Sequence, residues 1–269
     1  MRPASQPMWA LMGATAHLGA VARAAGVLDI GLAFPRANKT YERTDDFPIV
    51  FALQNSKLAE HLKPSIWFQI LNVTGGDTET LVDSTHELDW TSAAENDPYL
   101  LWSYLGVEGE GRLRLLWQPR WSACDESRDD VEVVRNRTDN FLVEFEIKAD
   151  GEKADLVAAT GGDDENCPNE GVGIDVTDKT LDAPVGSSGR ETCAVLGSSS
   201  SPTPTSNPCR VKIDKAAVES MQAADLEEMC RGSNPPEECP KDDLAPPRLT
   251  AAAGVASLAA VLSAFLFLA

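Results

Sequence analysis

Residues 141–148, with the sequence FLVEFEIK, alternate apolar and polar side chains almost without a break. Successive side chains of an extended strand point to opposite faces, so this alternation is typical of a strand with one buried face. Residues 112–117 alternate in the same way. Three more continuous apolar runs, at residues 47–53, 66–73 and 99–105, predict strands that are covered on both faces or lie near the centre of a sheet.

Turn-forming residues separate these runs, and no helical pattern long enough for a β-α-β unit lies between them. We therefore predict a mainly β fold, with an antiparallel β-sandwich of immunoglobulin-like general architecture over residues 25–160. The immunoglobulin disulfide is excluded because no cysteine precedes Cys124. The strand topology stays open. The turn residues are Asp45–Asp46, Gly75–Gly76–Asp77, Asn96–Asp97–Pro98 and Gly109–Glu110–Gly111.

Beyond residue 160 the chain becomes acidic, richer in cysteine and poorer in aromatic residues. Residues 161–240 are therefore predicted to be loop-rich and held by disulfides, because they offer little apolar surface to bury. A Ser/Thr/Pro segment at residues 197–208 is predicted to be a loop suited to O-linked sugars. One short helix is predicted over residues 214–230, with Asp214 as its N-cap.

The six cysteines predict three disulfides, since an even number of cysteines in a secreted chain is typical of a disulfide framework. The sequence leaves their pairing open. No CxxC pair is present and His61 and His86 are isolated, so we predict no metal site and no cofactor. The cysteines are Cys124, Cys167, Cys193, Cys209, Cys230 and Cys239.

Both ends of the sequence resemble targeting signals. Residues 1–24 combine Arg2, an apolar stretch and small residues before Ala24, which predicts a signal peptide cleaved after Ala24. Residues 249–269 carry no charge, and no cation follows them. We therefore expect a glycosylphosphatidylinositol (GPI) attachment signal within residues 241–269, with Asp243 as the attachment residue. A retained C-terminal membrane segment is the alternative.

Sequons and charge indicate the compartment. N-glycosylation sequons begin at Asn38, Asn72 and Asn136. The formal net charge of -19 disfavours nucleic-acid partners, because phosphate binding requires clustered cations. We expect a secreted glycoprotein on the extracellular face of the plasma membrane or in the cell wall, with the outer leaflet as its partner through the lipid anchor.

No catalytic residue can be assigned from the sequence. A serine triad requires a histidine, and neither His61 nor His86 lies near a G-x-S-x-G motif. With 42 Asp and Glu residues, any carboxylate pair can be nominated, so none is informative. Residues 163–166 (DDEN) lack the ligand spacing of a calcium loop and are expected to form a solvated turn. Enzyme activity is thus unsupported.

The tryptophans divide into two groups. Trp67, Trp102 and Trp117 lie inside apolar runs, where burial of the ring is the ordinary use of tryptophan. Trp90 and Trp121 lie near predicted strand ends and are the candidates for contact with a glycan.

Four segments carry a resemblance to a known family. Residues 29–36 (DIGLAFPR), 38–41 (NKTY) and 47–55 (FPIVFALQN) resemble the opening of an uncharacterised fungal family of secreted, often GPI-anchored proteins that is known only as a domain of unknown function. Residues 207–214 (NPCRVKID) resemble its closing cysteine-containing motif. The resemblance implies a fungal, extracellular, β-rich and disulfide-bonded protein, and it carries over no functional residue.

Two functions fit these observations. The leading hypothesis is a lipid-anchored cell-surface glycoprotein that acts in cell-wall organisation, adhesion or contact with a host or environment. Its partner would be a cell-wall polysaccharide or another surface protein. The alternative is an extracellular protein that binds or modifies carbohydrate, which is favoured by Trp90, Trp121 and the acidic surface.

Overall fold

The computed structural model describes residues 25–88, 95–107, 109–126, 130–162, 170–184, 191–197, 206–233, 235–237 and 239. The predicted signal peptide, the C-terminal segment from residue 241, Trp90, Cys167 and Asp243 lie outside the described residues. The chain divides into two units, Met1–Ala223 and Ala224–Ala269, and each is described by itself.

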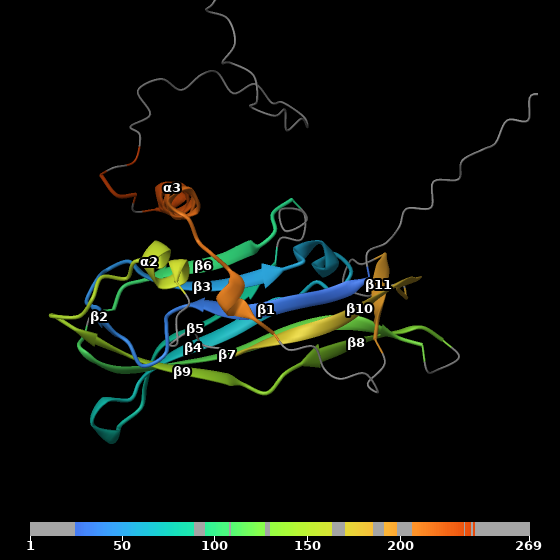
Figure 1. Ribbon diagram of the computed structural model, residues 1–269, viewed down its shortest axis with the longest axis horizontal. Helices are drawn as coiled ribbons and strands as arrows, with labels where there is room; N and C mark the ends of the chain where they lie inside the picture. Colours follow the sequence, from blue (N-terminus) through green and yellow to red (C-terminus); the bar gives the residue numbers. More distant parts are fainter. Residues whose placement is uncertain are drawn as a thin grey trace, which may run out of the picture. The chain divides into compact units, whose positions relative to one another are not determined.

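The N-terminal unit is mainly β, as predicted, and its described strands join in one mixed sheet that does not close (Figure 1). The main path through the sheet is β2-β9-β7-β11-β10-β1-β3-β6. Strand β4 pairs with β5 and β7, and β8 pairs with β7. The strands are β1 (Gly26–Phe34), β2 (Thr40–Glu42), β3 (Phe47–Gln54), β4 (Ser65–Asn72), β5 (Glu79–Glu87), β6 (Tyr99–Leu105), β7 (Gly111–Asp125), β8 (Glu132–Arg137), β9 (Phe141–Lys148), β10 (Gly171–Asp182) and β11 (Thr192–Leu196).

The pairing corrects the prediction of a purely antiparallel sheet. Strands β7 and β11 meet in parallel at Cys124 and Val195, and β2 runs parallel to β9. Because the pairings join all the described strands in one sheet, this order does not confirm an immunoglobulin-like sandwich. That finer architecture stays a prediction.

The segment predicted to be loop-rich contributes two strands to the middle of the sheet. Strand β10 pairs with β1 from Gly26↔Val176 to Gly31↔Gly171, and β11 lies between β10 and β7. Burial explains the placement, since Ile174 and Val176 are only 3% and 4% exposed and extend the core of the first 160 residues.

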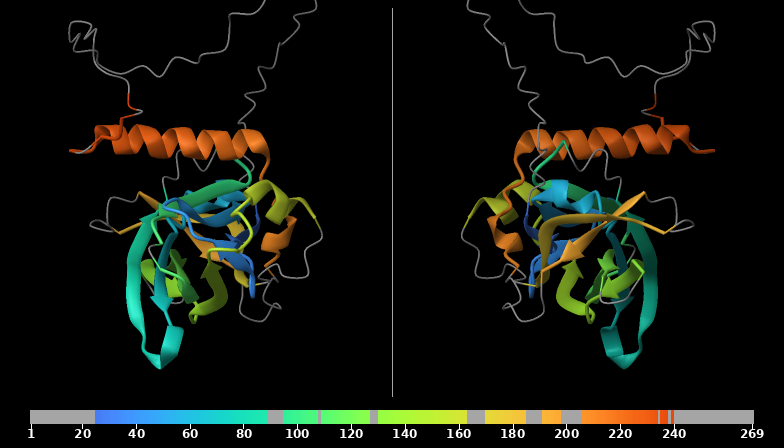
Figure 2. Two further views of the ribbon diagram at one scale, coloured as in Figure 1. Left: turned by 90° about the vertical axis from the view of Figure 1, so that its left-hand side faces the viewer. Right: turned by 90° about the vertical axis from the view of Figure 1, so that its right-hand side faces the viewer.

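Aromatic side chains fill the interior between the strands. The ring of Phe51 on β3 lies 5.8 Å from that of Phe68 on β4 and 5.3 Å from that of Trp117 on β7. Phe47, also on β3, stacks on Phe145 of β9 with 5.3 Å between the ring centroids. Strand β3 therefore packs against β4, β7 and β9 across the core, and Figure 2 shows blue β1 and β3 in a different layer from teal β4 and β5.

Two helices and three 3₁₀ turns accompany the strands in the described residues. The predicted helix is present as α3, where Asp214 Oδ1 accepts a hydrogen bond of 2.8 Å from the Ala217 N–H and caps the first turn. The prediction of a single helix is wrong, because α2 is a second one. None of the described helices is both long and apolar enough to cross a membrane. The elements are η1 (Ser56–Ala59), η2 (Thr74–Gly76), α2 (Leu156–Gly161), η3 (Pro208–Arg210) and α3 (Lys215–Arg231).

The disulfides supply the pairing that the sequence left open. Cys124 on β7 is bonded to Cys193 on β11, beside the parallel contact between these strands. In the C-terminal unit Cys230 is bonded to Cys239. Cys209 is also disulfide-bonded. No described cysteine is free.

The closing segment, residues 206–214, contacts β1 through hydrogen bonds and close packing. Buried Asp29 accepts hydrogen bonds from Ser206 Oγ and, at 2.8 Å, from the Asn207 N–H. Pro208 lies so close to Gly31 that a Cβ at position 31 would overlap its ring. The opening and closing motifs that carry the family resemblance therefore pack against each other.

Candidate ligand-binding groove

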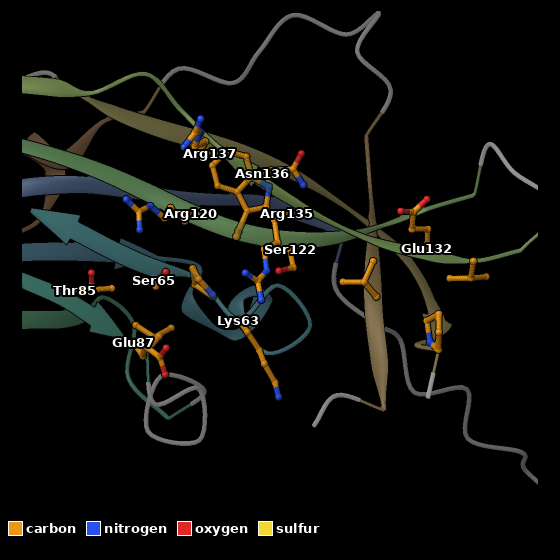
Figure 3. Close-up of a pocket in the computed structure, with 16 residues that line it drawn as sticks. Lys63, Ser65, Thr85, Glu87, Arg120, Ser122, Glu132, Arg135, Asn136 and Arg137 are labelled. Atoms are coloured by element: carbon orange, nitrogen blue, oxygen red, sulfur yellow. The ribbon is translucent and has the colours of Figure 1, made fainter. Parts of the chain in front are cut away.

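A groove of about 1320 Å³ lies over neighbouring ends of β4, β5, β7 and β8 (Figure 3). It belongs to the N-terminal unit. Its lining carries more cations than carboxylates, whereas the net charge of the whole chain is -19. Four cations and two carboxylates line it: Lys63, Arg120, Arg135, Arg137, Glu87 and Glu132.

The register of the strands places the three arginines of the lining on one face of the sheet. Residues directly opposite each other on paired strands project to the same face. Arg120 on β7 is opposite Ser65 on β4 and Arg137 on β8, so these three side chains form a row across the sheet. Ser122 and Arg135 form the next pair along β7 and β8.

The guanidinium group of Arg120 is held in place by its neighbours. Its Nε donates a hydrogen bond of 3.0 Å to Gln118 Oε1, and its Cζ lies 5.7 Å from the centre of the Trp67 ring. Gln118 is itself fixed, because its amide donates to Thr138 O at 2.9 Å and to Asn140 Oδ1 at 3.0 Å. The connection between β8 and β9 thus helps to position a cation in the groove.

Trp67 was expected in the core, but it is only half-buried and lies on the same face of the sheet as Arg120. Its Nε1 donates a hydrogen bond of 2.8 Å to Asp83 Oδ1 on β5. Trp102 is also half-buried, whereas Trp117 is fully buried as predicted. The alternation of β4 explains why Trp67 is not in the core, since Ile66 and Phe68 on either side of it occupy the core face.

Arg135 and Arg137 are exposed, and neither forms an ion pair with another described residue. Arg120 is half-buried, and it also forms no ion pair with another described residue. Like charges directly opposite each other on paired strands are destabilising. The pair formed by Arg120 and Arg137 therefore lowers the stability of the free protein.

The structure brings together Trp121 and Asn136, two residues singled out for different reasons in the sequence. They are opposite each other on β7 and β8, and both line the groove. Trp121 is half-buried and packs partly against the core, and its indole N–H finds no acceptor in the described residues. The amide of Asn136 donates to Val134 O at 3.2 Å.

The other predicted glycosylation sites lie away from the groove. Asn38 is exposed in the turn after β1, with a positive φ of 58°. Asn72 ends β4, where its Oδ1 accepts a hydrogen bond of 3.0 Å from the Thr74 N–H. Trp90, the second candidate for glycan contact, lies outside the described residues.

The histidines make hydrogen bonds between elements outside the groove. His86 Nε2 on β5 lies 2.7 Å from Ser103 Oγ on β6, and its ring stacks on Phe68 at 5.4 Å. His61 Nδ1 lies 2.9 Å from Thr192 Oγ1 on β11. Across the described residues, no group of three or more His, Cys, Asp or Glu side chains is placed to hold a metal ion.

Trp121 borders the groove but projects to the core face of β7, so the sequence pointed to a neighbouring residue and missed the arginines that line the groove. Trp121 was a candidate, but the arginines were not, because they come from two strands and meet only through the register of β7 with β8. The spacing of Arg135 and Arg137 by two residues was the available signal, since it puts both on one face of an extended strand.

Comparison with known proteins identifies one family. The model of that family, described as "Domain of unknown function (DUF7136)", matches residues 23–239. No curated protein and no solved structure matches the chain. The family description assigns no activity, so a function has to be argued from the groove.

Proposed function

We propose a function for this chain, which belongs to the DUF7136 family of proteins with a domain of unknown function: it is an extracellular binding protein that holds carbohydrate in the groove over β4, β5, β7 and β8. The observation that carries the proposal is the groove itself, in which the hydroxyl groups of Ser65 and Thr85 lie on the same face of the sheet as Arg120. Binding is proposed without catalysis, since no described feature favours a reaction.

The lining suits sugar rings. Ser65, Thr85 and Ser122 contribute hydroxyl groups, which can donate and accept hydrogen bonds as sugar hydroxyls do. A volume of about 1320 Å³ exceeds the usual size of a site for one small molecule, so the groove has room for several linked sugars.

The proposal places this binding outside the cell. Disulfides persist in oxidising compartments, which supports secretion, and the exposed position of Asn38 supports glycosylation there. The proposal includes a lipid anchor in the outer leaflet. It also includes a role in cell-wall organisation, adhesion or contact with a host or environment. The packing of β3 against β4, β7 and β9 supports an immunoglobulin-like sandwich as part of the same proposal.

A glycan array with the folded chain tests the binding function. We expect a defined oligosaccharide to bind, and we expect Thr85→Trp to abolish the signal by filling the groove from an exposed position. Thr80→Trp adds the same ring at an exposed position of β5 outside the groove and should leave binding intact. Silence on the array, or equal binding by both variants, contradicts the proposal.

The location is tested separately on intact cells. If the chain is held by a GPI anchor, a phosphatidylinositol-specific phospholipase will release it into the medium. Retention of the chain in the membrane fraction after treatment argues for a membrane segment instead.

A further inference from the structure

We infer that the ligand of this groove is an acidic glycan, a chain of sugars whose rings carry carboxylate groups, and that Arg120, Arg135 and Arg137 bind those carboxylates. This inference rests on the proposed function and adds the chemical class of the ligand. It is carried by the charge, the pairing and the geometry of the three arginines.

The local charge of the groove opposes that of the chain. Cations outnumber carboxylates among the lining residues, although the net charge of the chain is -19. The two carboxylates, Glu87 and Glu132, lie apart from the arginines, and Figure 3 shows them on opposite sides of the arginine-bearing stretch of β7 and β8. The centre of the groove is therefore positive.

Other cations on the same sheet are neutralised by carboxylates of this chain. Arg114 lies 2.6 Å from Glu144, and Lys148 lies 2.6 Å from Glu146. Arg120 and Arg137 instead face each other across β7 and β8, with no ion pair in the described part of the chain. The sheet pairs Arg114 and Lys148 with its own carboxylates but leaves Arg120 and Arg137 together, so an external anion can bind between them.

Arginine is suited to carboxylates because its planar guanidinium group offers two parallel N–H donors to two oxygens. Arg120 is oriented in advance by Gln118 and by the ring of Trp67. Arg135 and Arg137 lie two positions apart on the same face of β8. A ligand with carboxylates repeated along a chain can therefore engage more than one arginine at once.

The lining favours a glycan over a nucleic acid. A nucleic acid carries its charges densely along its whole length, and the acidic surface beyond the groove would repel the parts that extend past it. The hydroxyl groups of Ser65, Thr85 and Ser122 match sugar hydroxyls between the charged groups.

The test compares two probes by isothermal titration calorimetry with the glycosylated full chain: an oligogalacturonate and its neutral methyl ester. We expect the acid to bind at least roughly tenfold more tightly than the ester, as the gain from charge-assisted hydrogen bonds. The double variant R135Q/R137Q should lose that advantage, so that the acid and the ester bind with similar affinity. Both arginines are exposed and unpaired in the described residues, so the variant should fold, which circular dichroism checks.

A matched control removes the same charge elsewhere. Arg43 and Lys153 are exposed and do not line the groove, so R43Q/K153Q should bind the acid as the wild type does. Equal losses in both double variants mean that net charge, and not the groove, controls binding, which overturns the inference. Binding of a single-stranded DNA oligomer as tightly as the oligogalacturonate overturns the glycan assignment.

The remaining outcomes separate this inference from the proposed function. If the acid does not bind more tightly than the ester, but a neutral glycan binds in a manner that Thr85→Trp abolishes, the inference fails and the carbohydrate-binding function stands. If no glycan binds at all, both fail.

Discussion

Arg137 shows at the scale of one residue how a binding site conflicts with stability. Its partner across β7 and β8 is Arg120, a residue of the same charge, and neither has a carboxylate to offset the repulsion in the described structure. Residues that lower stability in this way are expected at functional sites, where the missing counter-charge belongs to the ligand.

Arg137→Gln should therefore stabilise the free protein. Removal of one member of a like-charge cross-strand pair is expected to raise the free energy of unfolding by roughly 0.2–1 kcal/mol. Urea denaturation at low ionic strength measures the change.

Arg112 gives the matched control, because it lies on the same strand but opposite an acid, Glu146. Arg112→Gln should lower the free energy of unfolding by a similar amount. A destabilised Arg137→Gln protein would show that Arg137 has a favourable structural role, and the argument from unpaired charge would lose its basis.

Glu170 is expected to make stability depend on pH. Partial burial raises the pKa of Glu170, and a hydrogen bond of 2.9 Å from the Leu142 N–H opposes that shift. A carboxyl whose pKa is higher in the folded state binds more protons when folded. Its contribution to stability is thus lost as the pH rises from the unfolded pKa through the folded pKa.

Glu170→Gln should remove this contribution and keep an oxygen as acceptor for the Leu142 N–H. Thermal denaturation between about pH 4 and pH 7 is the measurement, with the unfolded carboxyl titrating near its reference value of about 4.3. We expect the stability of the variant relative to the wild type to increase with pH. Parallel curves for the two proteins would contradict the role given to Glu170.

At the scale of elements, the closing segment depends on one glycine. Gly31 on β1 lies against Pro208, the first residue of η3, and a Cβ at position 31 would overlap the proline ring. Gly31→Ala should therefore push the closing segment off β1 and cost about 1–3 kcal/mol of unfolding free energy, as overpacking usually does.

The comparison for Gly31→Ala is Gly109→Ala, where a Cβ would meet no atom within 4 Å. Chemical denaturation of both variants measures the difference. If the two are equally stable, the contact between the opening and closing motifs is not what holds the segment.

The two described disulfides close loops of very different length. Cys124 and Cys193 are 69 residues apart, whereas Cys230 and Cys239 are 9 apart. In the chain-entropy account, the longer loop restricts the unfolded chain more.

Removal of Cys124 and Cys193 by alanine substitution should therefore cost about 2–5 kcal/mol and release β11 from β7. The variant lacking Cys230 and Cys239 should lose less in the same urea denaturation experiment. A larger loss in the second variant would mean that the bond at the end of α3 supports the fold more than loop length predicts.

The strands that could be predicted are those whose own residues show their environment. Residues 141–148 alternate cleanly and form β9. The apolar run at 99–105 forms the strand β6, but only Leu101 is buried in it, so the prediction that both of its faces are covered is wrong. β10 was missed because its buried residues, such as Ile174 and Val176, are few and lie in an acidic, cysteine-bearing region. Its partner β1 is distant in sequence, and a local pattern does not report a distant partner.

The groove illustrates the same limit. Trp121 was identified because an aromatic residue near a strand end stands out locally. The pairing of Arg120 with Arg137 is a property of the register between two strands. A net charge counted over the whole chain conceals such a cluster.

At the scale of the whole molecule, an acidic ligand meets two opposing fields. The net charge of -19 repels it at long range, and the arginines attract it only within the groove. Salt acts differently on the two, because the Debye length falls from about 30 Å at 0.01 M to about 8 Å at 0.15 M. Contacts within the groove are shorter than either Debye length, so salt screens them weakly. The repulsion from the whole surface acts over longer distances, so salt screens it more strongly.

We therefore expect the association rate constant of the oligogalacturonate to rise with salt over this range, on the order of several-fold, because screening first removes the long-range repulsion. The dissociation rate should rise as well, since salt also weakens the exposed ion pairs of the groove. Stopped-flow kinetics measures both rates, and the neutral methyl ester, which feels neither field, should show no salt dependence. An association rate that falls with salt would mean that the arginines govern the approach of the ligand despite the surrounding acidic surface.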